Sequence, residues 1–206
     1  MTIGNFQSMS SLVLIGTMIG GTIPSTIGAL TTLVSLDFTS NFLNGAIPSS
    51  MGALTSLTTF YLGSNFLTGT IPSGISALKL LNYLGISYNQ FNGIIPSSIG
   101  AMTKLVVINF SNNFFSGTIP STMSALTSLE YVYFQNNYLT MGTATTVPTS
   151  TFSSFTLSKV IFLSDNCLYG DTVSNTRQLS DKKITLDNVK EENVEVGTVV
   201  AVPIVK

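Results

Sequence analysis

Residues 30–53 read LTTLVSLDFTSNFLNGAIPSSMGA, and this 24-residue unit recurs along the chain. An Ile-Pro pair and an asparagine mark the copies, each returning at the same step. The pairs are Ile23-Pro24, Ile47-Pro48, Ile71-Pro72, Ile95-Pro96 and Ile119-Pro120, and the asparagines are Asn41, Asn65, Asn89, Asn113 and Asn137. A sequence that resembles itself at a period of roughly 20 to 50 residues folds as a stack of one repeated unit. The repeat therefore predicts a solenoid.

Each position in the unit has a physical reason. Residues 35–39 alternate, so Leu36 and Phe38 point into the stack while Ser35 and Asp37 point out. Strands of successive copies then pair into a parallel sheet, about 4.8 Å apart. Where the chain turns away from this sheet, a buried asparagine amide satisfies backbone groups that lack a ladder partner. We expect a structural ladder formed by Asn41, Asn65, Asn89, Asn113, Asn137 and Asn166.

Glycine and proline also recur every 24 residues. A glycine follows each of the first four ladder asparagines by four residues and allows backbone conformations that are closed to other residues. The proline of each Ile-Pro pair sets φ where no N–H is required. We assign this whole set to the scaffold. The glycines are Gly45, Gly69, Gly93 and Gly117.

The full pattern, LxxLxxLxLxxNxLxGxIPxxIGxL, resembles the plant-specific subclass of leucine-rich repeats over roughly residues 3 to 170. That subclass occurs in plant receptor ectodomains, polygalacturonase inhibitors and protist surface proteins. The resemblance implies an α/β solenoid, mostly β and irregular, that forms a right-handed curved stack of about seven repeats. A parallel sheet would line its concave side, and short 3-10 or irregular segments its convex side. It also implies an extracellular or cell-surface location, as part of a longer protein.

The two ends of the chain depart from the repeat. Ile3-Gly4-Asn5-Phe6 matches Ile27-Gly28-Ala29-Leu30 at the same step, so the sequence starts inside a repeat. We expect a fragment of a longer repeat protein, with an uncapped N-terminal edge through which it could self-associate. We assign residues 1–170 to the solenoid, with Thr17 in place of the first ladder asparagine. Residues 171–206 are expected to form cap strands or a loose tail.

Composition argues against several classes of function. The chain has 8 basic and 9 acidic residues and a net charge of −1, so it offers no basic field to nucleic acid. No apolar run reaches the roughly 18 residues of a membrane span. Histidine is absent, which removes the commonest general base and metal ligand. The lone Cys167 cannot form an intrachain disulfide. We expect no enzyme activity, no metal and no cofactor.

The acids of the repeats also lack catalytic spacing. Asp37 and Glu130 are four repeats apart, which places them roughly 19 Å from one another along the stack. Glycosidase carboxylates need about 5 to 9.5 Å. Asn109-Phe110-Ser111 is a glycosylation sequon, but it falls on the sheet face, which is a poor acceptor site.

The outward strand positions form the face on which a ligand could bind. The residues at these positions vary between copies, whereas the inward positions stay apolar, as expected if packing constrains only the inward set. Tyrosine is concentrated there, and rigid exposed aromatic side chains are favourable binding anchors. The alternative is that these rings only cover one another across neighbouring strands. The candidate binding residues are Tyr61, Tyr83, Tyr88, Asn109, Asn112, Tyr131, Tyr133, Gln135 and Phe162.

Three functions fit these observations. The first is a non-catalytic module that recognises a protein, a peptide or a glycan through the concave face, within a larger receptor-like protein. The second is a structural spacer or coat segment without a discrete ligand. The third is binding of ice or a crystalline glycan by regular hydroxyl rows, although small polar residues also suit tight turns. The rows are Thr22, Thr70 and Thr118, and Ser25, Ser49, Ser73, Ser97 and Ser121.

Overall fold

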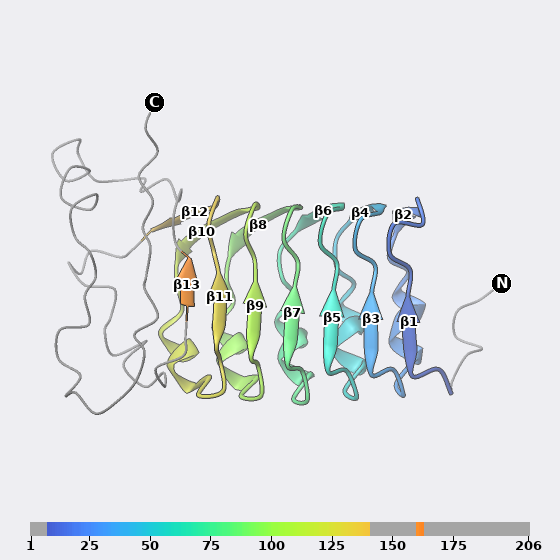
Figure 1. The fold of residues 1–206 in the computed structure, drawn as a ribbon, viewed down its shortest axis with the longest axis horizontal. Coiled ribbons are helices and arrows are strands. Elements are labelled where there is room, and N and C mark those ends of the chain that lie inside the picture. The colour runs from blue at the N-terminus through green and yellow to red at the C-terminus, as the bar shows by residue number, and fades with distance from the viewer. Residues whose placement is uncertain (1–7, 141–159, 163–206) are drawn as a thin grey trace, which may run out of the picture.

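The computed structural model describes residues 8–140 and 160–162, and these form a regular stack of repeats (Figure 1). Seven short strands lie side by side in the parallel order β1-β3-β5-β7-β9-β11-β13. Residues one repeat apart are partners, as Leu36 and Phe60 are. This is the predicted concave sheet. Its strands are β1 (Ser11–Val13), β3 (Ser35–Asp37), β5 (Thr59–Tyr61), β7 (Tyr83–Gly85), β9 (Val107–Asn109), β11 (Tyr131–Tyr133) and β13 (Val160–Phe162).

A second parallel sheet corrects the expectation that the chain only turns after each ladder asparagine. Six strands pair in the order β12-β10-β8-β6-β4-β2 along one edge of the stack (Figure 1). They form because equal repeats bring equivalent backbone segments alongside one another, and because Leu43 and its counterparts point inward between exposed neighbours. The strands are β2 (Gly20–Thr22), β4 (Phe42–Gly45), β6 (Phe66–Gly69), β8 (Gln90–Ile94), β10 (Phe114–Thr118) and β12 (Tyr138–Thr140).

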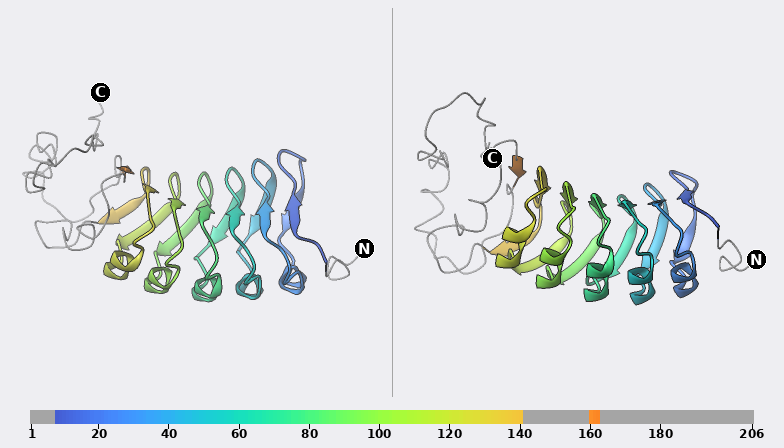
Figure 2. Two further views of the ribbon diagram at one scale, coloured as in Figure 1. Left: turned by 60° about the horizontal axis from the view of Figure 1, so that its bottom comes forward. Right: turned by 90° about the horizontal axis from the view of Figure 1, so that it is seen from below.

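Short 3-10 helices cover the side opposite the seven-stranded sheet (Figure 2). Each follows the proline of an Ile-Pro pair, which has an extended backbone, with φ −72° and ψ 143° at Pro24. The proline has no N–H to leave unpaired, and its carbonyl accepts the first bond of the turn, from Ile27 N at 3.0 Å. The helices are η2 (Ser25–Ala29), η3 (Ser49–Ala53), η4 (Ser73–Ala77), η5 (Ser97–Ala101) and η6 (Ser121–Ala125).

The asparagine ladder is confirmed in the described repeats. Asn65 is 6% exposed, and its Nδ2 donates to the carbonyls of Leu62 and Gly63 and, one repeat back, to that of Phe38 at 2.9 Å. Its Oδ1 accepts from the backbone N of Leu43 at 3.0 Å. The same contacts recur at each step, so the ladder ties the first sheet to the second and each repeat to the one before.

Two further expectations about the repeat are confirmed. Gly45, Gly69, Gly93 and Gly117 have φ between 72° and 77°, in the region that favours glycine. Thr17, at the first ladder position, donates its backbone N–H and its hydroxyl to Asn41 Oδ1 at 3.0 and 3.1 Å. Asn166 and the C-terminal segment 171–206 lie outside the described residues, so both stay predictions.

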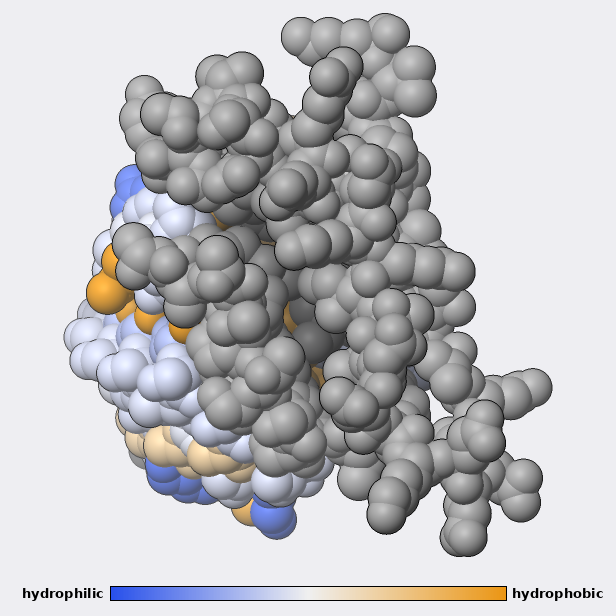
Figure 3. All heavy atoms as spheres, turned by 90° about the vertical axis from the view of Figure 1, so that its left-hand side faces the viewer, coloured by the Kyte–Doolittle hydropathy of each residue, from blue (hydrophilic) through white to orange (hydrophobic). Residues whose placement is uncertain are grey.

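The interior and the surface of the stack differ sharply in chemistry. The core is a single cluster of Leu, Ile, Phe and Met side chains, with five ladder asparagines beside it. The coloured residues in Figure 3 are mostly pale, with a few hydrophilic and a few hydrophobic places. Between residues 8 and 140 the charged side chains are Asp37, Lys79, Lys104 and Glu130. Charged side chains are therefore few in the described repeats.

Candidate binding surface

Three of the predicted tyrosines lie together on the open face of the concave sheet. Tyr83 and Tyr131 are 38% and 39% exposed, and Tyr133 is half-buried. The strand register places Val107 between Tyr83 and Tyr131, and pairs Tyr133 with Asn109. These side chains come from β7, β9 and β11, so parallel pairing alone brings them into one region. We call Tyr83, Val107, Asn109, Tyr131 and Tyr133 the concave patch.

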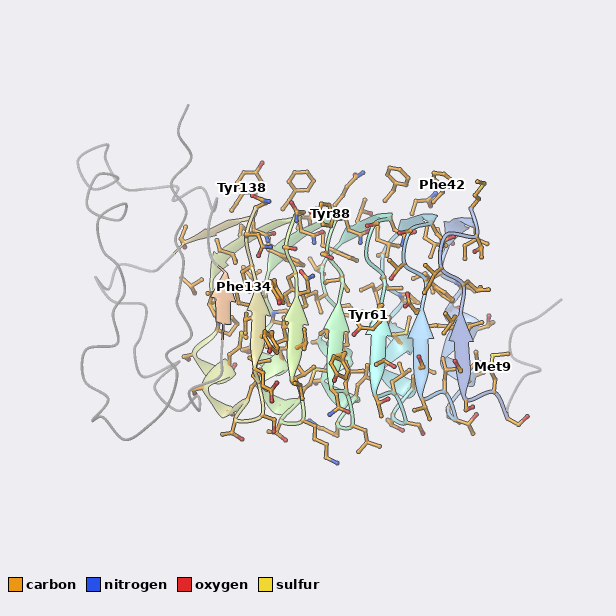
Figure 4. All side chains as sticks on the ribbon, in the orientation of Figure 1. Met9, Phe42, Tyr61, Tyr88, Phe134 and Tyr138 are labelled. Atoms are coloured by element: carbon orange, nitrogen blue, oxygen red, sulfur yellow. The ribbon has the colours of Figure 1, made fainter. Side chains whose placement is uncertain are left out.

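Tyr61, in contrast, is held against its own sheet. A Cβ built at Gly85, its partner on β7, would lie 2.6 Å from Tyr61 Cδ1 and 3.0 Å from Cε1, so the ring covers the glycine (Figure 4). Burial raises the pKa of the Tyr61 hydroxyl above its ordinary value of 10.0, and the nearby Tyr83 and Asp37 raise it further. Tyr61 therefore serves the scaffold as well as the face.

Tyr88 and Asn112 occupy the same turn position in two successive repeats. The residue before each ladder asparagine adopts the left-handed backbone region, with φ of 59°, 55°, 53°, 56° and 55° at Ser40, Ser64, Tyr88, Asn112 and Asn136. Non-glycine residues adopt it rarely, and Asn does so more readily than most. The side chain at this position varies between repeats, but the left-handed backbone restricts it to residues that tolerate a positive φ. Tyr88 is 61% exposed and projects from the turn.

Asn109 is less available to a ligand than its position suggested. Its Oδ1 accepts from the backbone N of Ser111 at 3.2 Å and from the Ser111 hydroxyl at 2.7 Å. Asp37 acts in the same way two residues before Thr39, whose backbone N donates to Asp37 Oδ1 at 2.9 Å. Both side chains close the turn at the end of a strand. Ser111 is the hydroxyl residue of the glycosylation sequon, and it is hydrogen-bonded to Asn109 and only 2% exposed.

Asn112 borders a hollow of about 330 Å³ at the C-terminal half of the turn region. Asn136 Nδ2 donates to Asn112 Oδ1 at 2.7 Å, one repeat away. In the part of the chain that the structure describes, Gln135 Oε1 is buried without a hydrogen-bond partner. Gln135 does not line the hollow, which combines asparagine amides with the rings of Phe114 and Tyr138. Its lining residues are Asn89, Asn112, Asn113, Phe114, Asn136, Asn137 and Tyr138.

An exposed row of rings on the second sheet was missed by the sequence analysis. The first residue of β4, β6, β8, β10 and β12 points outward, and four of the five are aromatic. The signal was present, since each follows a ladder asparagine directly. It was overlooked because that segment was taken for a turn without a face of its own. We call Phe42, Phe66, Gln90, Phe114 and Tyr138 the aromatic stripe.

Phe162 and Cys167 lie near or beyond the C-terminal end of the described repeats. The backbone of Phe162 pairs with that of Tyr133 in β11, while Cys167 lies outside the described residues.

Within residues 8–140, no His, Cys, Asp and Glu side chains gather in a group that could hold a metal ion. Over the same described part, no helix has the length and apolar character to cross a membrane. At the N-terminal end, an apolar hollow of about 290 Å³ lies beside Met9, Leu12 and Leu14.

Comparison with known proteins identifies the family. A family model described as Leucine Rich Repeat matches residues 56–78, 80–102 and 104–126. A chain of the BIR3–SERK2 complex from Arabidopsis thaliana is 35% identical, with a TM-score of 0.56, over 62% of this chain and 68% of that one. The chain belongs to the leucine-rich repeat family. It is of the plant type, as the Ile-Pro and Gly positions predicted, and no curated protein matches it in sequence.

Two other solved structures are similar to this leucine-rich repeat protein. The Arabidopsis receptor kinase HAESA, in complex with the peptide hormone IDA and the co-receptor SERK1, is 28% identical over 81% of this chain, with a TM-score of 0.69. A plant ice-binding protein is 27% identical over 78% of this chain and 58% of its own, with a TM-score of 0.64. The chain spans 28% of the HAESA chain, and 19% and 30% of two further plant receptors with TM-scores of 0.72.

Proposed function

We propose that this leucine-rich repeat protein is a non-catalytic recognition module that binds an extended peptide or protein segment across its concave patch. The observation that carries the proposal is the group of three part-exposed tyrosines on a stiff parallel sheet. Tyrosine offers a large amphipathic contact area at low cost in rotamer entropy. The likeness to a receptor that binds a peptide hormone supports this class of ligand over a spacer.

The length and the charge of the concave sheet indicate the size and the polarity of the ligand. The concave patch spans β7 to β11, about 10 Å at about 4.8 Å per strand, and the sheet from β1 to β11 extends for about 24 Å, which matches roughly seven residues of extended peptide. Asp37 is the one charged residue within the strands of this face that the structure describes. A ligand would therefore be held by ring contacts and by neutral hydrogen bonds, and we expect weak dependence of its affinity on salt.

A displayed random-peptide library tests the proposal. We expect the wild-type chain to enrich related peptides, and the Tyr131→Ala/Tyr133→Ala variant to lose them while its melting temperature changes little. The control is Ser73→Ala, an exposed site on η4 at the opposite side of the stack. No enrichment with the wild type, or equal enrichment with both variants, would reject the concave patch as the binding site.

Ice binding is a second candidate, favoured by a different observation. Ser25, Ser49, Ser73, Ser97 and Ser121 each begin a 3-10 helix and are all exposed, so they form an uninterrupted hydroxyl row at the repeat spacing. The ice-binding structural relative supports it. The companion threonine row is interrupted by Ala46 and Ile94. Thermal hysteresis that is lost in Ser73→Lys would support this candidate, and its absence in the wild type would reject it.

A further inference from the structure

The hollow of about 330 Å³ at the C-terminal half of the turn region is separate from the concave patch, with which it shares no lining residue. Two successive repeats build it. Asn112 and Phe114 belong to the first repeat, and Asn136 and Tyr138 to the second. Tyr138 projects from the edge of the stack there (Figure 4). We call these four residues the amide-ring site.

The amides of Asn112 and Asn136 keep hydrogen-bonding groups for a ligand. The ladder asparagines beneath them do not, as Asn113 shows, because its Nδ2 donates to three carbonyls and its Oδ1 accepts from the backbone N of Phe91. Asn136 Nδ2 donates to Asn112 Oδ1 at 2.7 Å. This leaves Asn112 Nδ2 as a donor and Asn136 Oδ1 as an acceptor, neither of which has a partner among the described residues.

The backbone holds these two amides in place before any ligand arrives. Asn112 and Asn136 have φ of 56° and 55°, so both turns have the same left-handed conformation. Their mutual hydrogen bond then fixes the two side chains relative to each other. A donor and an acceptor on one fixed pair of amides form a pre-organised polar surface, which binds at a lower cost in conformational entropy than free side chains.

Two rings supply the apolar wall of the site. Phe114 and Tyr138 have ring centroids 5.9 Å apart and planes within 13° of each other. They are 47% and 44% exposed, so each keeps about half of its surface for contact. Ligand pockets of about 300 to 1,000 Å³ typically combine such an apolar wall with a few polar groups, and this hollow is at the small end of that range.

We propose that the amide-ring site binds one pyranose unit of a neutral glycan. A sugar hydroxyl both donates and accepts, so two neighbouring hydroxyls can pair with Asn112 Nδ2 and Asn136 Oδ1 together. The C–H side of the same pyranose would pack on Phe114 and Tyr138. No charged residue lines the hollow, which argues against a phosphate, an acidic sugar or a divalent cation as the ligand.

A second pair of rings in the same chain shows what the amides add. Phe42 and Phe66 have ring centroids 6.1 Å apart and planes within 9°, and are 53% and 49% exposed. The turn residues that precede them are Ser40 and Ser64, with φ of 59° and 55°. The rings and the backbone are therefore alike in the two places, but serine replaces the amides. We expect a sugar to bind beside Phe114 and Tyr138 and not at this first pair.

Isothermal titration of the full chain with cellotetraose, mannotetraose and xylotetraose tests the proposal. We expect at least one of these neutral probes to bind with one site per chain, and the acidic trigalacturonate not to bind. Asn112→Ser/Asn136→Ser installs the residues that the first pair already has at the same φ and should weaken binding by about tenfold or more. Tyr138→Ala should weaken it similarly, through loss of ring contact.

Three matched variants separate this site from the other surfaces. Phe42→Ala should leave sugar binding unchanged, and so should Tyr131→Ala/Tyr133→Ala, which tests the concave patch independently. Ser40→Asn/Ser64→Asn should create a second site and raise the stoichiometry to two. Circular dichroism checks that each variant is folded.

Failure of all three neutral probes to bind would overturn the proposal, as would preferential binding of trigalacturonate. Equal losses in Phe42→Ala and Tyr138→Ala would also overturn it, because rings without amides would then suffice. Loss of sugar binding in the Tyr131→Ala/Tyr133→Ala variant would move the sugar to the concave patch.

Discussion

The ring of Tyr61 covers Gly85 on the neighbouring strand, with a Cβ at Gly85 placed only 2.6 Å from Tyr61 Cδ1. A glycine in a strand leaves the backbone ladder without a side chain above it, and a cross-strand aromatic ring supplies that cover. The pair explains why this tyrosine is half-buried while Tyr83 and Tyr131 remain more exposed. It separates a tyrosine that stabilises the sheet from those available to a ligand.

A double-mutant cycle should detect the contact between Tyr61 and Gly85. In the wild type, Gly85→Ala should destabilise the fold by about 1 to 3 kcal/mol, because the added methyl displaces the ring. In a Tyr61→Ala background the same change should stabilise it by about 0.5 to 1 kcal/mol, since alanine is favoured over glycine in a strand. Chemical denaturation measures both free energies. Additive effects of the two substitutions would contradict the contact.

The pKa of Tyr61 gives a prediction for alkaline pH. Its folded-state pKa lies above 10.0, so its contribution to stability is fully present below pH 10.0. That contribution is lost as pH rises through the raised pKa, because ionisation is easier in the unfolded chain. Asp37→Asn and Tyr83→Phe should each lower the pKa part of the way, since burial is its largest cause. Tyrosinate absorbance in a pH titration checks this, and Tyr131→Phe serves as the comparison.

The asparagine ladder should carry a large share of the stability of each repeat. Asn89 donates to the carbonyls of Leu62, Ile86 and Ser87, and its Oδ1 accepts from the backbone N of Leu67. Asn89→Ala leaves these buried groups unpaired and should lower the free energy of unfolding by about 3 to 5 kcal/mol. Asn92→Ala, at an exposed site three residues later, should change it by less than about 0.5 kcal/mol. Equal effects would show that the ladder is not what holds the turn.

The left-handed backbone at Tyr88 predicts which substitutions the turn accepts. Its φ is 53°, and the equivalent residues one and two repeats later are Asn112 and Asn136. Tyr88→Asn should therefore be close to neutral in thermal unfolding. Tyr88→Val should cost about 1 to 3 kcal/mol, because a β-branched side chain is strained in that region. A valine variant as stable as the asparagine variant would contradict the role of this φ.

Much of the candidate surface could be predicted from the sequence. The features that could not be predicted share one physical cause. Alternation placed Tyr83, Tyr131 and Tyr133 on the open face correctly, because side-chain direction in a strand follows from position alone. The same logic could not show that Tyr61 lies on Gly85 or that Asn109 closes a turn onto Ser111. Those outcomes depend on distances between side chains in the folded chain. The exposed stripe was visible in the spacing, but its meaning required the second sheet.

The stack of repeats follows directly from the sequence. The 24-residue step fixes which leucines point inward, where the asparagine ladder runs and where glycine and proline shape the turns, since these follow from geometry within one unit. Which outward side chains cover a neighbour and which are exposed depends on how the repeats pack against one another. The same packing aligns Phe42, Phe66, Phe114 and Tyr138 along one edge. Such relations join residues one repeat or more apart, and they arise only when stacking brings the repeats together.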